Sequence, residues 1–321
     1  MGNFFTSLFS SAKTEETADS KAKSDQKNFD ILKYDGVRAQ KIRQVAYAIK
    51  CFTEALNIQE DFETMSYLVT AYTGNNEPEK ALEVLNRMAE LEPEHINTLL
   101  TRANILFMLD REPEVIADCM RIIELDETNH LAWYLMSRAK KITGDQFGAI
   151  ANLTKTLALK EDFLEAYLLR ADILLSMQQA QEALQDVEKA IELSPEEESA
   201  FLLRGRIHEA MGNSEAAEED YQQVQDLNPF NEEAVLLAGK LLISCGKLTE
   251  AIVFFDEAIE MNPEFAKAYA ERGRAKNLSG NKDAAFADLK KAIELNPEGE
   301  EAKKLDGQHT NFDDMYKGGI F

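Results

Sequence analysis

Arginine and aspartate recur in this chain at one fixed spacing. A guanidinium in such a pattern either pairs with a carboxylate of the protein or captures one from a ligand. In four places an aspartate follows an arginine sixteen residues later: Arg102 and Asp118, Arg170 and Asp186, Arg204 and Asp220, and Arg272 and Asp288. In three further places both members are replaced together: Met136 and Asn152, Ala238 and Phe254, and Leu68 and Val84. Joint replacement is typical of ion-pair partners, because a buried charge left alone is costly. We predict salt bridges between packed helices, with capture of a ligand carboxylate as the alternative.

The remaining titratable residues form no recognisable catalytic or metal-binding motif. The four histidines, His95, His130, His208 and His309, give neither HExxH nor a cluster with cysteine. There is no GxSxG and no glycine-rich phosphate loop. His208 falls on an apolar stripe and is interpreted as a core histidine. The sequence predicts no catalytic residue, no metal site and no cofactor, so we expect no enzyme. An active site hidden by the repeats described below is the alternative.

The net charge argues against some classes of partner. The chain has 35 basic and 58 acidic residues, for a formal net charge of −23. Nucleic acid is not expected as a partner, because binding its phosphates relies on clustered lysine and arginine. Electrostatic docking on an anionic membrane is disfavoured for the same reason. The acidity is typical of a solvated outer surface.

Cysteine usage and hydropathy indicate the compartment. Cys51, Cys119 and Cys245 lie far apart, form no CxxC motif and fall within helical patterns. We interpret them as small core residues and expect no disulfide framework, which suits a reducing compartment. The sequence has no uninterrupted apolar run of about 18 residues and no secretory signal pattern. We therefore expect a cytoplasmic protein.

Prolines divide the chain at a fixed period. Pro229, Pro263 and Pro297 each end a similar four-residue segment and lie 34 residues apart. Pro93 and Pro195 fall in the same register. A constant period of this length indicates stacked repeats, each of which buries its apolar face against its neighbours.

Each repeat is predicted to be an antiparallel pair of helices. In the repeat before Pro229, apolar periodicity predicts helices over 198–211 and 214–227, with Gly212 ending the first. Small residues recur at the place of Gly205 on the first helix, and alanine at the place of Ala217 on the second. Small residues let two helices approach closely, as a hairpin requires.

The period divides the chain into three parts. Residues 1–28 are expected to be a flexible segment with an apolar stripe at Phe4, Phe5, Leu8 and Phe9, followed by a linker over 10–28 without apolar periodicity. Residues 29–299 hold about eight repeats, and residues 300–321 a short capping helix and a tail. The units are 29–61, 62–95, 96–129, 130–163, 164–197, 198–231, 232–265 and 266–299.

The repeat resembles the tetratricopeptide repeat, whose pattern is W-x2-L-G-x2-Y, then A-x3-F, then P. The last unit has Tyr269, Gly273, Ala285 and Pro297 at the matching places. The resemblance implies an all-α fold, a right-handed superhelical solenoid of antiparallel hairpins whose first helices line a concave groove. It also implies binding of peptides or proteins, with no chemistry of its own.

Two columns of residues, one pair on each first helix, would lie in that groove. The first column is Leu100, Tyr134, Leu168, Leu202, Leu236 and Ala270, and the second is Asn104, Arg138, Asp172, Arg206, Lys240 and Arg274. Basic residues stand at four of the six second-column positions of an acidic chain. We predict that these columns, apart from Asp172 and Ala270, bind a segment with apolar and acidic side chains. The alternative is that the leucines only complete packing between repeats.

These patterns predict a scaffold or adaptor that holds partner proteins. The alternative is an assembly or trafficking factor that works at a membrane through its N-terminal segment. The chain starts Met-Gly-Asn-Phe-Phe-Thr, which fits the M-G-x-x-x-[ST] signal for myristoylation. A single acyl chain gives only marginal membrane binding, and residues 1–28 contain no basic cluster. Membrane association is therefore the less favoured expectation.

Overall fold

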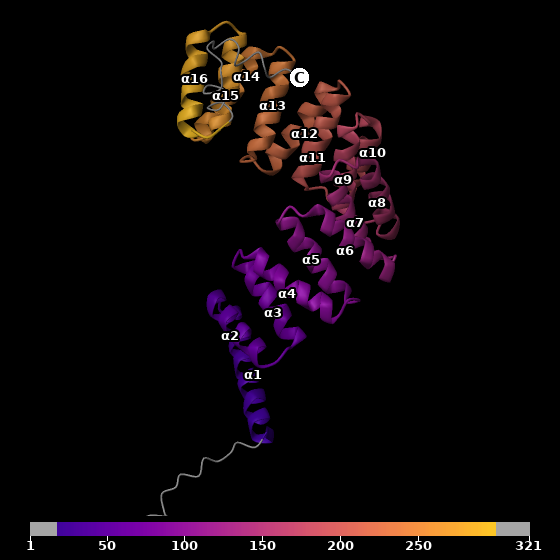
Figure 1. The fold of residues 1–321 in the computed structure, drawn as a ribbon. Coiled ribbons are helices and arrows are strands. Elements are labelled where there is room, and N and C mark those ends of the chain that lie inside the picture. The colour runs from indigo at the N-terminus through magenta and orange to yellow at the C-terminus, as the bar shows by residue number, and fades with distance from the viewer. Residues whose placement is uncertain (1–17, 300–321) are drawn as a thin grey trace, which may run out of the picture. The chain divides into compact units, whose positions relative to one another are not determined.

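The computed structural model describes residues 18–299, which form sixteen α-helices and no strand (Figure 1). Consecutive helices pair as antiparallel hairpins, so the predicted all-α repeat fold is confirmed. The chain divides into two compact units, Met1–Lys160 and Glu161–Phe321. The predicted apolar stripe near the N-terminus and the predicted capping helix and tail over 300–321 lie outside the described residues.

The N-terminal unit holds four hairpins. Its first and second helices alternate along the chain, and the second helix of one hairpin packs on the first helix of the next. The helices are α1 Ala18–Lys41, α2 Val45–Ile58, α3 Phe62–Gly74, α4 Pro78–Leu91, α5 Ile96–Met108, α6 Glu112–Leu125, α7 His130–Ile142 and α8 Gln146–Leu159.

The C-terminal unit also holds four hairpins, and from α3 onward each first helix begins 34 residues after the previous one. Within each unit, neighbouring first helices also contact one another directly: α5 with α7, α9 with α11, and α13 with α15. The helices of this unit are α9 Leu164–Ser176, α10 Ala180–Leu193, α11 Glu198–Ala210, α12 Ser214–Leu227, α13 Glu232–Ser244, α14 Leu248–Met261, α15 Ala266–Leu278 and α16 Lys282–Leu295.

The first helix begins earlier than the sequence predicts. The predicted linker is wrong over residues 18–28, because α1 is already helical from Ala18. Residues 21–28 are exposed on every side, so no apolar stripe reveals this extension. Alanine, lysine and glutamine in it are good helix formers, and the Gln26 amide donates to Asp30 over 3.0 Å one turn later. Local propensity thus extends the helix beyond the part that packs.

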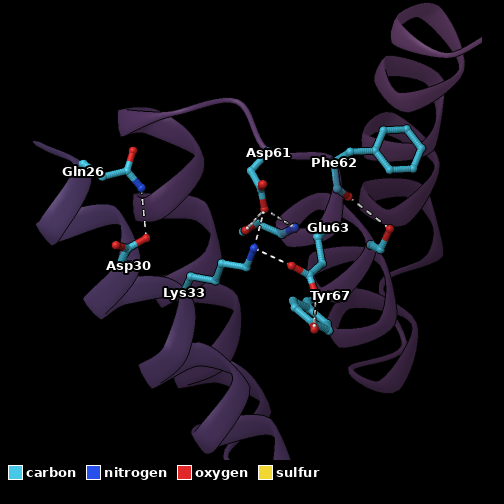
Figure 2. A network of polar contacts seen from close by, with 9 residues as sticks. Gln26, Asp30, Lys33, Asp61, Phe62, Glu63 and Tyr67 are labelled. Carbon is cyan, nitrogen blue, oxygen red and sulfur yellow. Dashed lines mark hydrogen bonds and ion pairs between the residues drawn. The ribbon is translucent and has the colours of Figure 1, made fainter. Parts of the chain in front are cut away.

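Lys33 ties α1 to the start of α3 (Figure 2). Its ammonium lies 2.9 Å from Oδ2 of Asp61 and 2.6 Å from Oε2 of Glu63, and its side chain is only 13% exposed. Asp61 is also the N-cap of α3 and accepts the backbone N–H of Thr64 over 2.8 Å. The Tyr67 hydroxyl donates to Glu63 over 2.8 Å and completes the network. This network fixes the extended first helix against the second hairpin.

In the α11–α12 and α13–α14 hairpins, a glycine on the first helix lies against an aromatic ring of the second helix. Tyr221 of α12 and Phe255 of α14 are fully buried. A Cβ added at Gly205 would overlap the Tyr221 ring, and one added at Gly239 would overlap the Phe255 ring. At Gly205 and Gly239, the absence of a side chain is therefore explained by an aromatic ring packed across the hairpin.

A left-handed residue terminates the first helix of most hairpins. Gly144, Gly212, Gly246 and Gly280 have φ between 75° and 88°. Four hairpins use a non-glycine residue at the corresponding place, namely Arg43, Asn76, Asp110 and Gln178, with φ between 52° and 61°. Such a conformation costs free energy for a residue with a Cβ, so these turns are strained where the glycine turns are not.

The cysteine interpretation holds for two of the three residues. Cys51 and Cys119 are buried, and burial raises the pKa of the Cys119 thiol to about 12. The core assignment is wrong for Cys245, which is exposed. This residue is the C-cap of α13, so it lies just past the packed part of the helix.

Candidate functional site

All four predicted ion pairs are present. In each, Nε and Nη2 of the arginine donate to the aspartate carboxylate over 2.5–3.1 Å. The aspartate side chains are only 4–8% exposed. Hydrogen bonding to Asp118 raises the pKa of the Arg102 guanidinium above its ordinary value. Because the arginines are committed to these buried carboxylates, their role is to join the two helices of a hairpin.

Arg102 and Arg272 also reach the preceding hairpin. Nη1 of Arg272 donates to Asp256 of α14 over 2.6 Å, while its other nitrogens bond Asp288 of α16. Arg102 does the same with Asn86 of α4, over 3.2 Å. Each of these guanidiniums therefore joins three helices, which couples one repeat to the next.

In the N-terminal unit, the predicted columns meet on α5 and α7. Arg138 of α7 lies with its guanidinium 4.6 Å from the ring centre of Phe107 on α5 and 6.0 Å from that of Tyr134. Leu100 is half-buried beside them, and Asn104 is exposed, with its amide donating to the Leu100 carbonyl over 2.9 Å. Within residues 18–299, no carboxylate lies within ion-pair distance of Arg138. We call these five residues the aromatic–arginine face.

In the C-terminal unit, the basic column behaves differently at each position. Arg206 is exposed, and no carboxylate of the described residues lies within ion-pair distance of it. Lys240 and Arg274 both approach Glu271, each over 3.4 Å. Glu271 is 17% exposed and neutralises part of the positive charge that the sequence places here. Arg206 is thus the cation of this unit's column whose charge no described carboxylate neutralises.

The leucine column of the C-terminal unit belongs mainly to the core. Leu202 is 7% exposed and Leu236 is 9% exposed, and both lie in buried apolar clusters that join neighbouring hairpins. Leu168 is half-buried. At 202 and 236 this burial favours the packing alternative, because the contact between repeats leaves little of either side chain exposed to a ligand.

Sequence reasoning missed two residues of these surfaces. Phe107 lies seven residues after Leu100, on the same stripe of α5, and a third column read down the array would have found it. Glu271 lies beside the stripe, next to Ala270, and no column pointed to it. Its role depends on side chains of α13 and α15 meeting, which periodicity along one helix does not encode.

Two of the histidines, His95 and His208, have structural positions. The His95 ring caps α5 by accepting the Thr98 backbone N–H over 3.2 Å, and it packs edge-on against Phe62. His208 lies 3.8 Å from Asp220, behind the Arg204 pair. Over residues 18–299, no group of three histidine, cysteine or acidic side chains is arranged to hold a metal ion. None of the described helices is long and apolar enough to span a bilayer.

Comparison with known proteins agrees with this class of helical repeat scaffold. Tetratricopeptide repeat models match residues 202–260, and a second such model matches residues 164–197 and 266–298. The Photosystem I assembly protein Ycf3 of Acaryochloris marina (strain MBIC 11017) is 32% identical over 142 residues, which cover 41% of this chain and 82% of the relative. The chain belongs to the tetratricopeptide repeat family.

Solved structures show the same fold. A tetratricopeptide repeat protein from Parabacteroides merdae ATCC 43184 superposes with a TM-score of 0.62 at 19% identity, over 76% of this chain and 96% of the other. A chain of the APC/C hetero-tetramer Cut9–Hcn1 gives a TM-score of 0.56 at 13% identity, over 86% of this chain and 53% of that one. At these identities the likeness shows the fold.

Proposed function

We propose that this protein is a scaffold that binds a segment of a partner protein on its first helices, and that the segment carries apolar and acidic side chains. The aromatic–arginine face is the observation that supports this most directly. Arg138 is positioned by Phe107 and Tyr134, and no protein carboxylate within the described residues pairs with it. A half-buried guanidinium held by aromatic rings is a good receptor for a carboxylate.

The apolar part of the proposed contact comes from the same residues. Tyr134, Phe107 and Leu100 are half-buried, so each offers surface to a ligand while being held by packing. Rigid aromatic anchors lose little conformational entropy on binding, and aromatic and arginine residues carry most of the energy at protein interfaces. In the C-terminal unit, Arg206 and the Lys240–Glu271–Arg274 group would add weaker, solvent-screened contacts.

Peptide display on the purified chain tests this proposal. Peptides recovered by the wild type should contain Asp or Glu next to apolar residues. Arg138→Glu should reverse this charge preference toward Lys and Arg, because the attraction at the centre of the face changes sign. Lys155→Glu is the matched control, since Lys155 is an exposed cation on α8 of the same unit. A recovered set without charge preference, or one that Arg138→Glu leaves unchanged, contradicts the proposal.

Assembly of a larger complex is a second candidate function. It is favoured by the relative from Acaryochloris marina, which is named as an assembly protein. An assembly factor holds its partner transiently, whereas an adaptor remains in the complex. Pulse–chase labelling with affinity purification of this protein separates the two. Newly made partner that is bound early and released later supports assembly, and partner retained throughout supports a permanent adaptor.

The predicted N-terminal membrane contact lies outside the described residues and remains part of this second proposal. Flotation with liposomes compares the full chain, with and without the acyl group, to a chain starting at Asn28. Flotation of only the acylated full chain supports a membrane-based role. Recovery of all three in the soluble fraction contradicts it.

A further inference from the structure

A surface distinct from the aromatic–arginine face is present in the C-terminal unit, at the hairpin formed by α13 and α14. It lies mainly on α14, the second helix of that hairpin. This hairpin lacks the arginine–aspartate pair and has Ala238 and Phe254 instead. Phe254 is therefore not covered by a guanidinium, and it remains half-buried beside Val253, which is 51% exposed. The loss of the ion pair leaves apolar surface open at this position.

Phe254 and Val253 line a shallow hollow of about 370 Å³. Its apolar lining is formed by Leu242 at the end of α13 and by Val253 and Phe254 of α14. Phe254 is fixed by an edge-to-face contact with the buried Phe255, with ring centres 5.9 Å apart. A hollow of this size suits one or two apolar side chains, and its floor is pre-formed.

Three glutamates surround this lining: Glu218 from α12, and Glu250 and Glu257 from α14. All three are exposed. Glu250 and Glu257 lie two turns apart on the helix face that carries Val253, so they stand on either side of it. Lys247 pairs with one of them, and its Nζ lies 3.5 Å from Glu218. Within the described residues, Glu250 and Glu257 have no ion-pair partner.

We propose that this hollow, defined by Leu242, Val253 and Phe254 inside the three glutamates, binds a basic amphipathic segment of a partner protein. Apolar side chains of the segment enter the hollow, and its lysines or arginines meet the glutamates. The charge of the rim selects this occupant, because a row of unneutralised carboxylates favours cations and repels acidic segments. The surface is separate from the aromatic–arginine face and prefers the opposite charge.

The acidic rim is not a general consequence of losing the ion pair. The hairpin of α3 and α4 also lacks the pair and has Val84 at the place of Phe254. There the places of Glu250 and Glu257 are taken by Lys80 and Arg87, which pair with Glu77 and Glu60. The charges around the α14 hollow are therefore particular to that hairpin, which supports a specific partner there.

Binding of a synthetic amphipathic Leu–Lys peptide to the full chain tests the proposal. Cys245 provides a reporter, because it is exposed three residues beyond Leu242, whereas Cys51 and Cys119 are buried. A thiol-reactive, environment-sensitive dye can be attached there, and its emission followed on titration with the peptide. A Leu–Glu peptide of the same pattern is the charge control and should not bind.

Two pairs of matched variants locate the contact. Replacement of Glu218, Glu250 and Glu257 by Gln should weaken the Leu–Lys peptide roughly tenfold, since each rim charge contributes a fraction of a tenfold step. The charge-matched control replaces the exposed Glu79, Glu83 and Glu90 of α4 by Gln and should leave the affinity within about twofold. Val253→Ser should weaken binding by about fivefold, whereas Met120→Ser, at a similarly exposed residue of α6, should not.

A gain of affinity is the sharpest prediction. Lys247→Gln removes the cation beside Glu218, so the peptide should bind about twofold to threefold more tightly. Arg138→Glu should not change the affinity, which separates this surface from the proposed function. Equal weakening by the α4 control variant, unchanged affinity after Val253→Ser, or no tightening by Lys247→Gln would each overturn the proposal. Circular dichroism of every variant confirms that it is folded.

Discussion

Arg204 of α11 and Asp220 of α12 form a buried, doubly hydrogen-bonded ion pair inside one hairpin. Nε of Arg204 lies 3.0 and 3.1 Å from the two carboxylate oxygens, and Nη2 lies 2.6 Å from Oδ1. Asp220 is 4% exposed, whereas the Arg204 side chain is 27% exposed. The guanidinium also packs over the Phe201 ring, 5.4 Å from its centre. This arrangement predicts an order of stability among variants.

Arg204→Leu should be the most damaging substitution in this pair, because it leaves the buried Asp220 charge without its partner. We expect a loss of about 3–5 kcal/mol in the free energy of unfolding. Asp220→Ala should cost less, about 2–3 kcal/mol, since the remaining guanidinium can reach water. The double variant Arg204→Leu with Asp220→Phe should be more stable than either single variant. Urea denaturation checks this order, and a single variant as stable as the wild type would place the pair on the surface.

Gly239 should not tolerate a side chain. Gly239→Ala places a methyl group against the buried Phe255 ring, so we expect a loss of about 1–3 kcal/mol by overpacking. Phe255→Leu in the same chain should recover part of that loss, because the smaller side chain makes room. Gly74→Ala is the control: its Cβ would meet nothing within 4 Å. It should stabilise the protein by about 0.5–1 kcal/mol in the same denaturation experiment.

Replacing the turn residue Gln178 by glycine should stabilise the protein. It adopts φ of 61° where Gly212 adopts 77° at the corresponding turn of the next hairpin. Gln178→Gly relieves the left-handed strain and should raise the unfolding free energy by about 0.5–1 kcal/mol. The reverse exchange, Gly212→Gln, should lower it by a similar amount. Opposite shifts in thermal midpoint confirm the explanation, and shifts of the same sign refute it.

Docking of α1 through Lys33 should depend on pH. Partial burial alone would raise the pKa of Asp61, but hydrogen bonds from Thr64 and Lys33 outweigh it and lower that pKa. Hydrogen bonds from Lys33 and Tyr67 lower the pKa of Glu63. For Lys33, partial burial alone would lower the pKa, yet hydrogen bonds to Glu63 and Asp61 outweigh it and raise the pKa above 10.5.

The directions of these pKa shifts determine how the stability of the protein changes with pH. A carboxylate with a lowered folded-state pKa contributes stability above its unfolded pKa, near 4, and loses it as the pH falls further. Because the folded-state pKa of Lys33 is raised, its contribution to stability is present below its unfolded-state pKa. This contribution is lost only as the pH rises through the higher folded-state pKa. Wild type should therefore exceed Lys33→Met in urea midpoint by a constant amount from pH 6 to 9. That difference should shrink below about pH 4, and a difference independent of pH would exclude the ionic network as its cause.

Much of the fold could be predicted because the same pattern of residue types recurs in successive repeats. Residue types at a fixed interval define each hairpin, and joint replacement of Arg and Asp revealed a tertiary contact without any structure. The extension of α1 escaped prediction because nothing packs on residues 21–28. The left-handed Gln178 escaped it because its side chain does not reveal its φ.

The candidate site could be predicted only in part. The columns on the first helices identified Arg138 and Tyr134, because neighbouring repeats place equal positions side by side. They did not show that Leu202 is buried between hairpins or that Glu271 pairs with two of the cations. The hollow on α14 was also missed, since its lining combines residues of α12, α13 and α14.

Photo-crosslinking from the aromatic–arginine face tests the central claim most directly. A photoreactive phenylalanine analogue replaces Tyr134 in the full chain, and the same analogue at the exposed Lys155 of α8 is the control. Irradiation in cells followed by mass spectrometry should give a discrete protein adduct from position 134 and not from position 155. Arg138→Glu should reduce that adduct strongly. Equal adducts from both positions, or an adduct from position 134 that Arg138→Glu leaves unchanged, would contradict binding of a partner segment on the first helices.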